Sequence, residues 1–219
     1  MMNKQKGNMY PWVTHTWNAI RGKCPYDCNY CYMKNLIKNK KLRLEEKELE
    51  TDLGQNNFIF VGSSIDMFAE TIPRIWIEKV LAHCRKYPNN TYLFQSKNPK
   101  RFYEFIKLRM FPKRTILGTT IETNRNYETK APQPKERYMA MKNIKEFEKM
   151  VSIEPIMDFD FNIMVGMIYF IRPKFVSIGA DSKGHNLPEP PKERLIKLIE
   201  ELTRFTKVKV KDNLKRLLI

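Results

Sequence analysis

The stretch RGKCPYDCNYCY, residues 21–32, is the most informative part of this chain, because it holds three of the four cysteines. Cys24, Cys28 and Cys31 have the spacing C-x3-C-x2-C, and the aromatic residue Tyr30 directly precedes the third. In a reducing compartment, thiols this close together favour a metal site over disulfide bonds. The stretch therefore predicts a metal-binding loop.

Two kinds of metal centre fit this loop. A structural zinc site needs a fourth ligand, for which His15, His83 and His185 are the available histidines. A [4Fe-4S] cluster normally takes four cysteines, so a cluster on three would leave one iron open to another ligand. The spacing alone leaves both alternatives open.

Short apolar, β-branched runs alternate with amphipathic segments around this loop, which is typical of βα units on a parallel sheet. We predict six units. Strands are expected at 12–20, 57–62, 91–95, 115–121, 150–154 and 174–179, and helices at 32–50, 73–86, 99–108, 135–149, 160–171 and 191–204. A last strand at 207–211, in which Lys alternates with Val, is expected at the sheet edge.

Polar residues follow the predicted strands, at the carboxyl ends where parallel βα folds carry their chemistry. Each of these residues alone could be a helix cap or a turn residue. A purely structural barrel, however, would not need a polar group at every strand end. The residues are Gly62, Ser63 and Ser64 with Asp66, then 95–97, Thr119 and Thr120 with Glu122 and Asn124, Glu154, and Gly179 with 181–182.

The composition fits a globular protein of 219 residues, 42% of them hydrophobic. This length suits one domain, so we treat 1–219 as a single domain that ends in an edge strand and tail at 205–219. The best apolar run, 161–171, is too short to span a membrane. The first residues lack the apolar run of a signal peptide, so we expect a cytoplasmic protein.

The charge favours a polyanion partner. Lys and Arg number 40 against 24 Asp and Glu, so the net charge is 40 − 24 = +16, and the cations cluster at 34–43, 97–114 and 204–216. Cations that neutralise phosphates release counterions, which makes DNA or RNA the natural partner. The alternative is a basic surface that has no partner.

At the cysteine motif the sequence resembles the radical S-adenosylmethionine (SAM) superfamily, whose hallmark is C-x3-C-x2-C with an aromatic residue in the slot of Tyr30. Four further segments resemble a compact, phage-associated group within it that is similar to spore photoproduct lyase. They are FVGSSIDMF at 60–68, FQSKNP at 94–99, LGTTIETN at 117–124 and VSIEP at 151–155. The resemblance covers nearly the whole chain and implies an α/β fold, a partial (β/α)6 barrel.

The resemblance also implies cofactors. Cys24, Cys28 and Cys31 would hold a [4Fe-4S] cluster whose open iron binds SAM. Reductive cleavage of SAM would give a 5′-deoxyadenosyl radical that takes a hydrogen atom from the substrate. A one-electron reductant of the flavodoxin or ferredoxin type would be a partner.

Some positions match the superfamily's SAM-binding sites. Residues 62–64 match the methionyl amine site, although hydroxyls replace the usual Gly-Gly-Glu carboxylate there and Asp66 could supply the missing acceptor. Glu122, and less directly Thr120 or Asn124, match the ribose site. The adenine would meet the Tyr30 backbone and the strand end at Gly179. The implied SAM-binding residues are Tyr30, Gly62, Ser63, Ser64, Thr120, Glu122, Asn124 and Gly179.

The sequence identifies no catalytic acid, base or hydrogen donor. Lys97, Glu154, Asp181 and His15 could line the mouth, although Lys97 could equally pair with Glu122. Photoproduct lyases use a cysteine as hydrogen donor, whereas the spare cysteine here is Cys84. It falls on a helical apolar stripe with Ile77, Val80 and Leu81, which predicts a structural thiol and argues against direct photoproduct repair.

Three functions therefore compete. The first is a radical SAM enzyme that modifies a nucleic acid, a nucleotide or another phosphate-bearing substrate. The second keeps this chemistry and takes a peptide or a small metabolite. The third is a non-catalytic, zinc-stabilised basic module that binds DNA or RNA.

Overall fold

A curved parallel sheet forms the centre of the computed structural model, which describes residues 1–5, 9–31, 33–37 and 40–219. In the described residues its eight strands have the order β1-β2-β5-β6-β7-β8-β9-β10, and only the pair β1 and β2 is antiparallel. The strands are β1 Asn3–Lys4, β2 His15–Trp17, β5 Phe58–Val61, β6 Thr91–Gln95, β7 Thr115–Thr120, β8 Glu148–Ile153, β9 Phe175–Ile178 and β10 Lys207–Val210.

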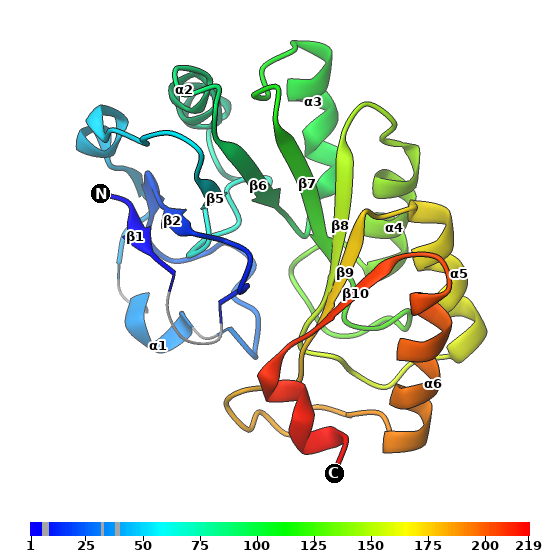
Figure 1. Cartoon of the computed structure of the whole chain (residues 1–219). Coiled ribbons are helices and arrows are strands. Elements are labelled where there is room, and N and C mark those ends of the chain that lie inside the picture. Colours follow the sequence, from blue (N-terminus) through cyan, green and yellow to red (C-terminus); the bar gives the residue numbers. More distant parts are fainter. Residues whose placement is uncertain (6–8, 32, 38–39) are drawn as a thin grey trace.

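Helices cover the outer face of this sheet, from α2 beside β6 to α6 beside β10 (Figure 1). They bury one apolar stripe each: α6, for example, turns Leu195, Leu198 and Leu202 inward at a spacing of three and four residues. No helix in the described part of the chain is long and apolar enough to cross a membrane. The helices are α2 Arg74–Arg85, η2 Pro99–Arg101, α3 Phe102–Lys107, α4 Pro134–Asn143, α5 Phe161–Ile171, α6 Lys192–Thr203 and η3 Asp212–Leu217.

From residue 57 onward the predicted order of strands and helices is confirmed, and β10 is the predicted edge strand. One boundary is wrong by several residues. The helix expected to reach Lys149 ends at Asn143, because Ile144 adopts an extended backbone conformation. Lys149 lies instead in β8, where its buried ammonium donates a hydrogen bond of 2.9 Å to the Ile144 carbonyl.

The first unit differs from the prediction. The strand expected at 12–20 is reduced to β2, and the helix expected at 32–50 is wrong. In its place are a short α1, Lys34–Ile37, and a 3-10 turn η1, Glu46–Glu50. Between them, β4, Arg43–Leu44, pairs antiparallel with β3, Ile20–Arg21. Tyr32, where we expected the helix to begin, lies outside the described residues.

Glu48 explains why the Glu-rich stretch is not an exposed helix. Its carboxylate is 8% exposed, and it accepts hydrogen bonds from Arg21 at 2.6 Å and from the Trp17 indole at 3.1 Å. A buried carboxylate must be paired, and its partners lie on β3 and β2. The hydrogen bonds of this carboxylate hold η1 against β2 and β3, next to the β3–β4 ribbon that flanks the cysteine loop.

The amino ends of the strands are closed by the N-terminal segment. Tyr10 and Val13 pack on an apolar layer inside the barrel. The Tyr10 hydroxyl reaches deeper, and lies 2.9 Å from both Gln95 Oε1 and Ser152 Oγ. The interior therefore changes from apolar to polar toward the carboxyl ends. The apolar layer consists of Phe60, Leu93, Ile116, Met150 and Phe175.

We predict that Phe68→Ala lowers the free energy of unfolding by about 3–5 kcal/mol, because the ring is fully buried and leaves a cavity. Phe68 contacts Phe102 at a centroid distance of 4.7 Å and also packs on three other rings. Urea denaturation followed by circular dichroism measures the loss. Phe170→Ala is the control: its ring is 51% exposed, so a change within about 0.5 kcal/mol is expected. Equal losses would contradict this packing.

Candidate active site at the carboxyl ends of the strands

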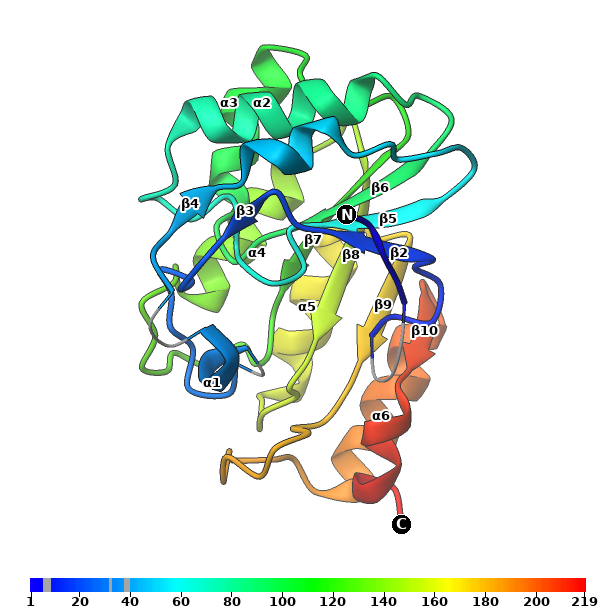
Figure 2. The same cartoon turned by 90° about the vertical axis from the view of Figure 1, so that its left-hand side faces the viewer.

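The cysteine loop lies over the carboxyl ends of neighbouring strands. Cys24 interacts with Asp66, which follows β5, and a backbone hydrogen bond from Asp66 reaches the Cys24 thiol. Cys28 interacts with Lys97, which follows β6, and with Glu122, which follows β7. Figure 2 shows α1, the next element after the loop, at the end toward which β8 and β9 point. The loop thus covers the mouth of the barrel beside the ends of β5, β6 and β7.

The three thiols of the loop are free and half-buried. Burial, with the charge of Asp66, raises the pKa of the Cys24 thiol to about 12. Burial also raises the pKa of Cys28, although the Lys97 ammonium opposes this shift. Cys28 interacts electrostatically with both Cys24 and Cys31, so the three thiols share one region. A metal would have to displace the protons of these thiols, since thiolates are the ligands.

The histidines that could complete a zinc site have partners elsewhere in the chain. In the described part of the chain, no three His, Cys, Asp or Glu side chains converge closely enough to hold a metal ion. A closed zinc site needs four ligands, yet each histidine contacts a residue outside the loop. His15 lies near Thr14, His83 lies 2.8 Å from the Thr51 carbonyl oxygen, and His185 lies 2.7 Å from Asp181. A cluster with three protein ligands needs no fourth side chain.

Beside Cys24, the hydroxyl of Tyr26 is buried and has no hydrogen-bond partner among the described residues. Burial raises the pKa of Tyr26, and Asp66 and Cys24 add to this shift. A buried polar atom without a partner is uncommon in a native protein. Its place beside the thiols is consistent with a polar group that binds under the loop.

A buried ion cluster anchors the loop to the barrel. Glu122 is 0% exposed, and its carboxylate pairs with Lys97 and, at 2.7 Å, with Arg137. Tyr30, from the cysteine loop, donates its hydroxyl to the same carboxylate and accepts a hydrogen bond of 2.9 Å from Lys97. Burial opposes the ionisation of Glu122, but the two cations outweigh it and lower its pKa to about 2. The pairing of Lys97 with Glu122, one of our two alternatives, is confirmed.

Arg137 and Tyr127 complete this cluster and were missed by the sequence analysis. Arg137 is 0% exposed and donates to the Thr120 carbonyl at 3.0 Å and to the Tyr127 hydroxyl at 2.9 Å. In the sequence it stands in the charged run 135–137, which reads as an exposed helical face. Arg137 is charged and does not belong to an apolar stripe at helical spacing. The sequence therefore carried no signal that its side chain is buried.

The turn after β5 presents the two predicted serines. Gly62 adopts a φ of +77°, and an added Cβ would lie 3.2 Å from Met67, so a side chain is disfavoured there. Ser64 donates to Asn18 Oδ1 from both its N–H and its hydroxyl, each at 2.9 Å, and Asn18 donates to Ser63 Oγ at 3.1 Å. Asn18 directly follows β2 and was missed, because an isolated Asn in a turn carries no distinctive signal.

Asp66 ties the ends of β5 and β6 together. It accepts hydrogen bonds of 2.7 Å from the Ser96 hydroxyl and from the Lys97 N–H, and a third of 3.1 Å from the Phe68 N–H. Burial raises its pKa, and these donors oppose the rise. The acceptor that we considered for the SAM amine is therefore already bonded within the chain.

The remaining SAM candidates are not all together. Thr120 accepts a hydrogen bond of 2.9 Å from Gln95 inside the barrel. Asn124 exchanges hydrogen bonds with Asp160, at 3.0 and 2.7 Å, and so holds the β7–α4 connection to the start of α5. His15, a candidate for the mouth, instead lies at the start of β2 beside Thr14, in register with Ile59.

On the far side of the mouth, the C-terminal residues reach into the barrel. Lys211 donates to both oxygens of Glu154 at 2.9 Å, and its side chain is only 7% exposed. Asn213 adds a hydrogen bond of 3.1 Å to Glu154. Gly179 makes room for this carboxylate, because a Cβ would come within 2.7 Å of it. Sequence analysis missed Lys211 and Asn213. The alternation of Lys with Val at 207–211 was a usable signal for Lys211, because alternate residues of a strand lie on the same face.

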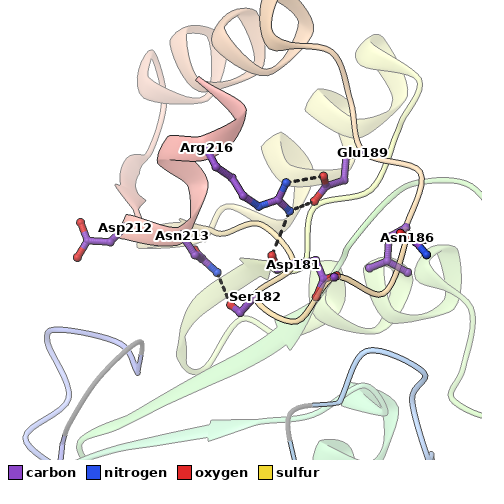
Figure 3. A pocket seen from close by; sticks show the side chains of 9 residues that line it. Asp181, Ser182, Asn186, Glu189, Asp212, Asn213 and Arg216 are labelled. Carbon is purple, nitrogen blue, oxygen red and sulfur yellow. Dashed lines mark hydrogen bonds and ion pairs between the residues drawn. The ribbon is translucent and has the colours of Figure 1, made fainter. Parts of the chain in front are cut away.

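An open pocket of about 940 Å³ adjoins this pair, between the β9–α6 connection and η3. Figure 3 shows Arg216 of η3 reaching toward Glu189 and Asp181, with Asn213 directed at Ser182. Asp181 is 7% exposed, and it accepts hydrogen bonds from Lys183 and His185, which shapes the loop. The mouth thus has a thiol-lined side and a carboxylate-rich side.

Comparison with solved structures identifies this architecture. Spore photoproduct lyase with bound AdoMet and dinucleoside spore photoproduct, in a mutant form, has a TM-score of 0.68 at 10% identity, over 94% of this chain and 78% of that one. Another complex with the dinucleoside has a TM-score of 0.67 at 10% identity, with the same coverage. SuiB of Streptococcus suis, bound to precursor peptide SuiA, has a TM-score of 0.60 at 12% identity, over 89% of this chain and 48% of that one.

The fold is therefore the partial barrel of the radical SAM type, as the sequence predicted. The chain belongs to the family described as "Protein of unknown function (DUF5131)", which matches residues 8–187. No curated protein matches the sequence.

We predict that Glu122→Gln lowers the free energy of unfolding by about 3–5 kcal/mol, because it leaves Lys97 and Arg137 buried without a counter-charge. Guanidinium denaturation measures the change. Glu148→Gln is the matched control, because it removes an ion pair whose side chains are both more than half exposed and should change stability by less than about 1 kcal/mol. Similar values for the two variants would show that the buried cluster does not hold the fold.

Proposed function

We propose that this chain is a radical SAM enzyme that holds a [4Fe-4S] cluster on Cys24, Cys28 and Cys31 and binds SAM beside it. One observation carries the proposal: three free thiols share one loop at the carboxyl ends of a barrel whose fold matches spore photoproduct lyase with bound AdoMet. Similarity of fold alone would not support a function, because one fold can carry many chemistries. The position of the cysteine loop supplies the additional support.

The chain's own residues would position the cofactors and shield them. When bound, the cluster and SAM supply the reductive cleavage that yields a 5′-deoxyadenosyl radical for hydrogen abstraction. Tyr30 and Glu122 fix the loop, which limits access of water to the site. Lys97 and Arg137 place two positive charges near Cys28 and so favour its thiolate, the form that binds iron.

We propose Gly62, Ser63 and Ser64 for the methionyl group of SAM, with Asn18 orienting both hydroxyls. Glu122, Thr120 and Asn124 are proposed for the ribose, and the Tyr30 backbone with Gly179 for the adenine. All three have partners within the chain, but Thr120 accepts a single hydrogen bond from Gln95, whereas Glu122 is ion-paired and Asn124 makes two hydrogen bonds with Asp160. Thr120 would therefore contact the ribose with the smaller rearrangement.

For the substrate we propose a nucleic acid, a nucleotide or another phosphate-bearing molecule. The net charge of +16 supports this class, as does the dinucleoside bound to a structure of the same fold. The second candidate is a peptide, since SuiB has the same fold and was solved with a precursor peptide. We further propose one domain over 1–219, a cytoplasmic location and a flavodoxin- or ferredoxin-type reductant.

We predict that replacing Cys24, Cys28 or Cys31 singly by Ala abolishes cluster binding and SAM cleavage, because each thiolate would hold one iron. Iron and sulfide content, EPR with and without SAM, and 5′-deoxyadenosine formation after anaerobic reconstitution measure the loss. Cys84→Ala is the control. This thiol is 0% exposed on α2, so its loss should cost about 1 kcal/mol of stability and leave the cluster intact.

One outcome would count against the proposal, and another against the structural role of Cys84. A wild-type protein that takes up one zinc ion, forms no cluster and ignores SAM would favour the non-catalytic basic module. Loss of SAM cleavage in Cys84→Ala, with cluster and fold intact, would contradict the structural assignment of that thiol.

We predict that oligonucleotides, but not peptides of similar length, increase the rate of 5′-deoxyadenosine formation, because substrate binding completes the site. Deuterium transfer from labelled oligonucleotide into 5′-deoxyadenosine would identify hydrogen abstraction directly. Stimulation by peptides alone would transfer the proposal to the second substrate class.

A further inference from the structure

The connections at the two ends of the barrel carry opposite charge. The five connections from β5, β6, β7, β8 and β9 to the helices that follow lie at the carboxyl end and contain 4 Lys or Arg and 9 Asp or Glu, so 4 − 9 = −5. The five connections from helices back to β6, β7, β8, β9 and β10 lie at the amino end and contain 8 cations and 1 anion, so 8 − 1 = +7. Among these ten connections the positive charge therefore lies at the amino end, while the segment 21–43 around the cysteine loop carries 7 cations and 1 anion of its own.

These amino-end cations are available to a partner. All eight are exposed. In the described residues, only Lys174 and Arg204 have a carboxylate within ion-pair distance, at 2.7 Å from Glu148 and Glu201 respectively. The eight are Lys86, Arg109, Lys113, Arg114, Lys145, Arg172, Lys174 and Arg204.

A groove of about 580 Å³ lies among them, along the first residues of the strands. Lys113 lines it together with Lys207 and Lys209 of the edge strand β10, and so do Glu146 and Glu148, the second of which is paired with Lys174. The Lys209 ammonium lies 4.1 Å from the ring centre of Trp12, which forms part of the floor. Burial, together with Lys207, lowers the pKa of Lys209, so a nearby anion would relieve the repulsion between these two ammonium groups.

We propose that the amino ends of the strands form a binding surface for the phosphodiester backbone of a nucleic acid. The cations come from five separate connections and extend across the whole end of the barrel, which suits a repeating chain of phosphates better than one small anion. The cores of protein interfaces are depleted in charged residues, so an acidic protein is a poorer fit.

This surface is an anchor and not the reaction site. Strands of four to six residues span about 13–20 Å at about 3.3 Å per residue, so a backbone held there lies that far from the mouth. The inference deepens the proposed function by locating the nucleic-acid contact, and it rests on that function for the choice of nucleic acid as the polyanion.

Two triple variants with equal charge change test the proposal. The first replaces Lys86, Lys113 and Lys207 at the amino end by Gln. The control replaces Lys130, Lys183 and Lys215 at the carboxyl end by Gln. Fluorescence anisotropy with a labelled DNA duplex of random sequence, between about 50 and about 200 mM salt, measures binding. Circular dichroism melts confirm that both variants fold.

We expect the amino-end variant to bind about tenfold more weakly, with the slope of log K against log salt reduced by up to about 2.7, or 0.9 for each lost phosphate contact. The control should stay within about twofold of the unmodified chain. Equal weakening in both variants would overturn the proposal, because net charge alone would then decide. So would the absence of salt-dependent binding, or competition by poly-glutamate as effective as by DNA.

The assay needs neither cluster nor SAM, so its result is separate from the proposed function. DNA binding through the amino end without cluster assembly would keep this surface and contradict the radical SAM enzyme. SAM cleavage without amino-end DNA binding would do the reverse.

Discussion

The buried carboxylate of Glu122 is the constraint on which the site depends. An isolated charge in a protein interior is unfavourable by several kcal/mol, so Glu122 must be neutralised by partners with good geometry. Those partners come from three other parts of the chain: Lys97 after β6, Arg137 on α4 and Tyr30 on the cysteine loop. Pairing one charge therefore joins two strand ends, an outer helix and the loop, and fixes the loop over the mouth.

The same physical demand shapes the other side of the mouth. Glu154 lies at the end of β8, and its charge is met by Lys211 and Asn213 from the C-terminal residues. Gly179 lacks the side chain that would collide with this carboxylate. The mouth is thus bounded by two carboxylates, one tied to the cysteine loop and one tied to the C-terminal segment, and this asymmetry separates the proposed cluster from the open pocket beside η3.

Polarity also runs along the barrel axis. Tyr10 and Val13 close the amino ends over an apolar layer, whereas polar groups gather at the carboxyl ends. Charge divides the connections of the barrel differently, since most of their cations lie at the closed end. The net charge alone suggested a polyanion partner without indicating where it binds. The arrangement of the charges favours contact with a polyanion at the end of the molecule opposite the mouth.

The parallel barrel from residue 57 onward and the burial of Cys84 could be predicted from the sequence alone, whereas the metal-binding role of the cysteine loop stays a prediction. The periodicity of apolar residues and the spacing of the thiols are local signals. They can be recognised without knowing which residues come into contact in the folded chain. The β3–β4 ribbon, which replaces the helix expected at 32–50, depends on tertiary contacts, and so does the inward placement of Arg137 and Lys211. Glu48, Glu122 and Glu154 caused these differences, because a carboxylate buried by the fold takes whichever cation or polar donor the fold brings near, regardless of its distance along the chain.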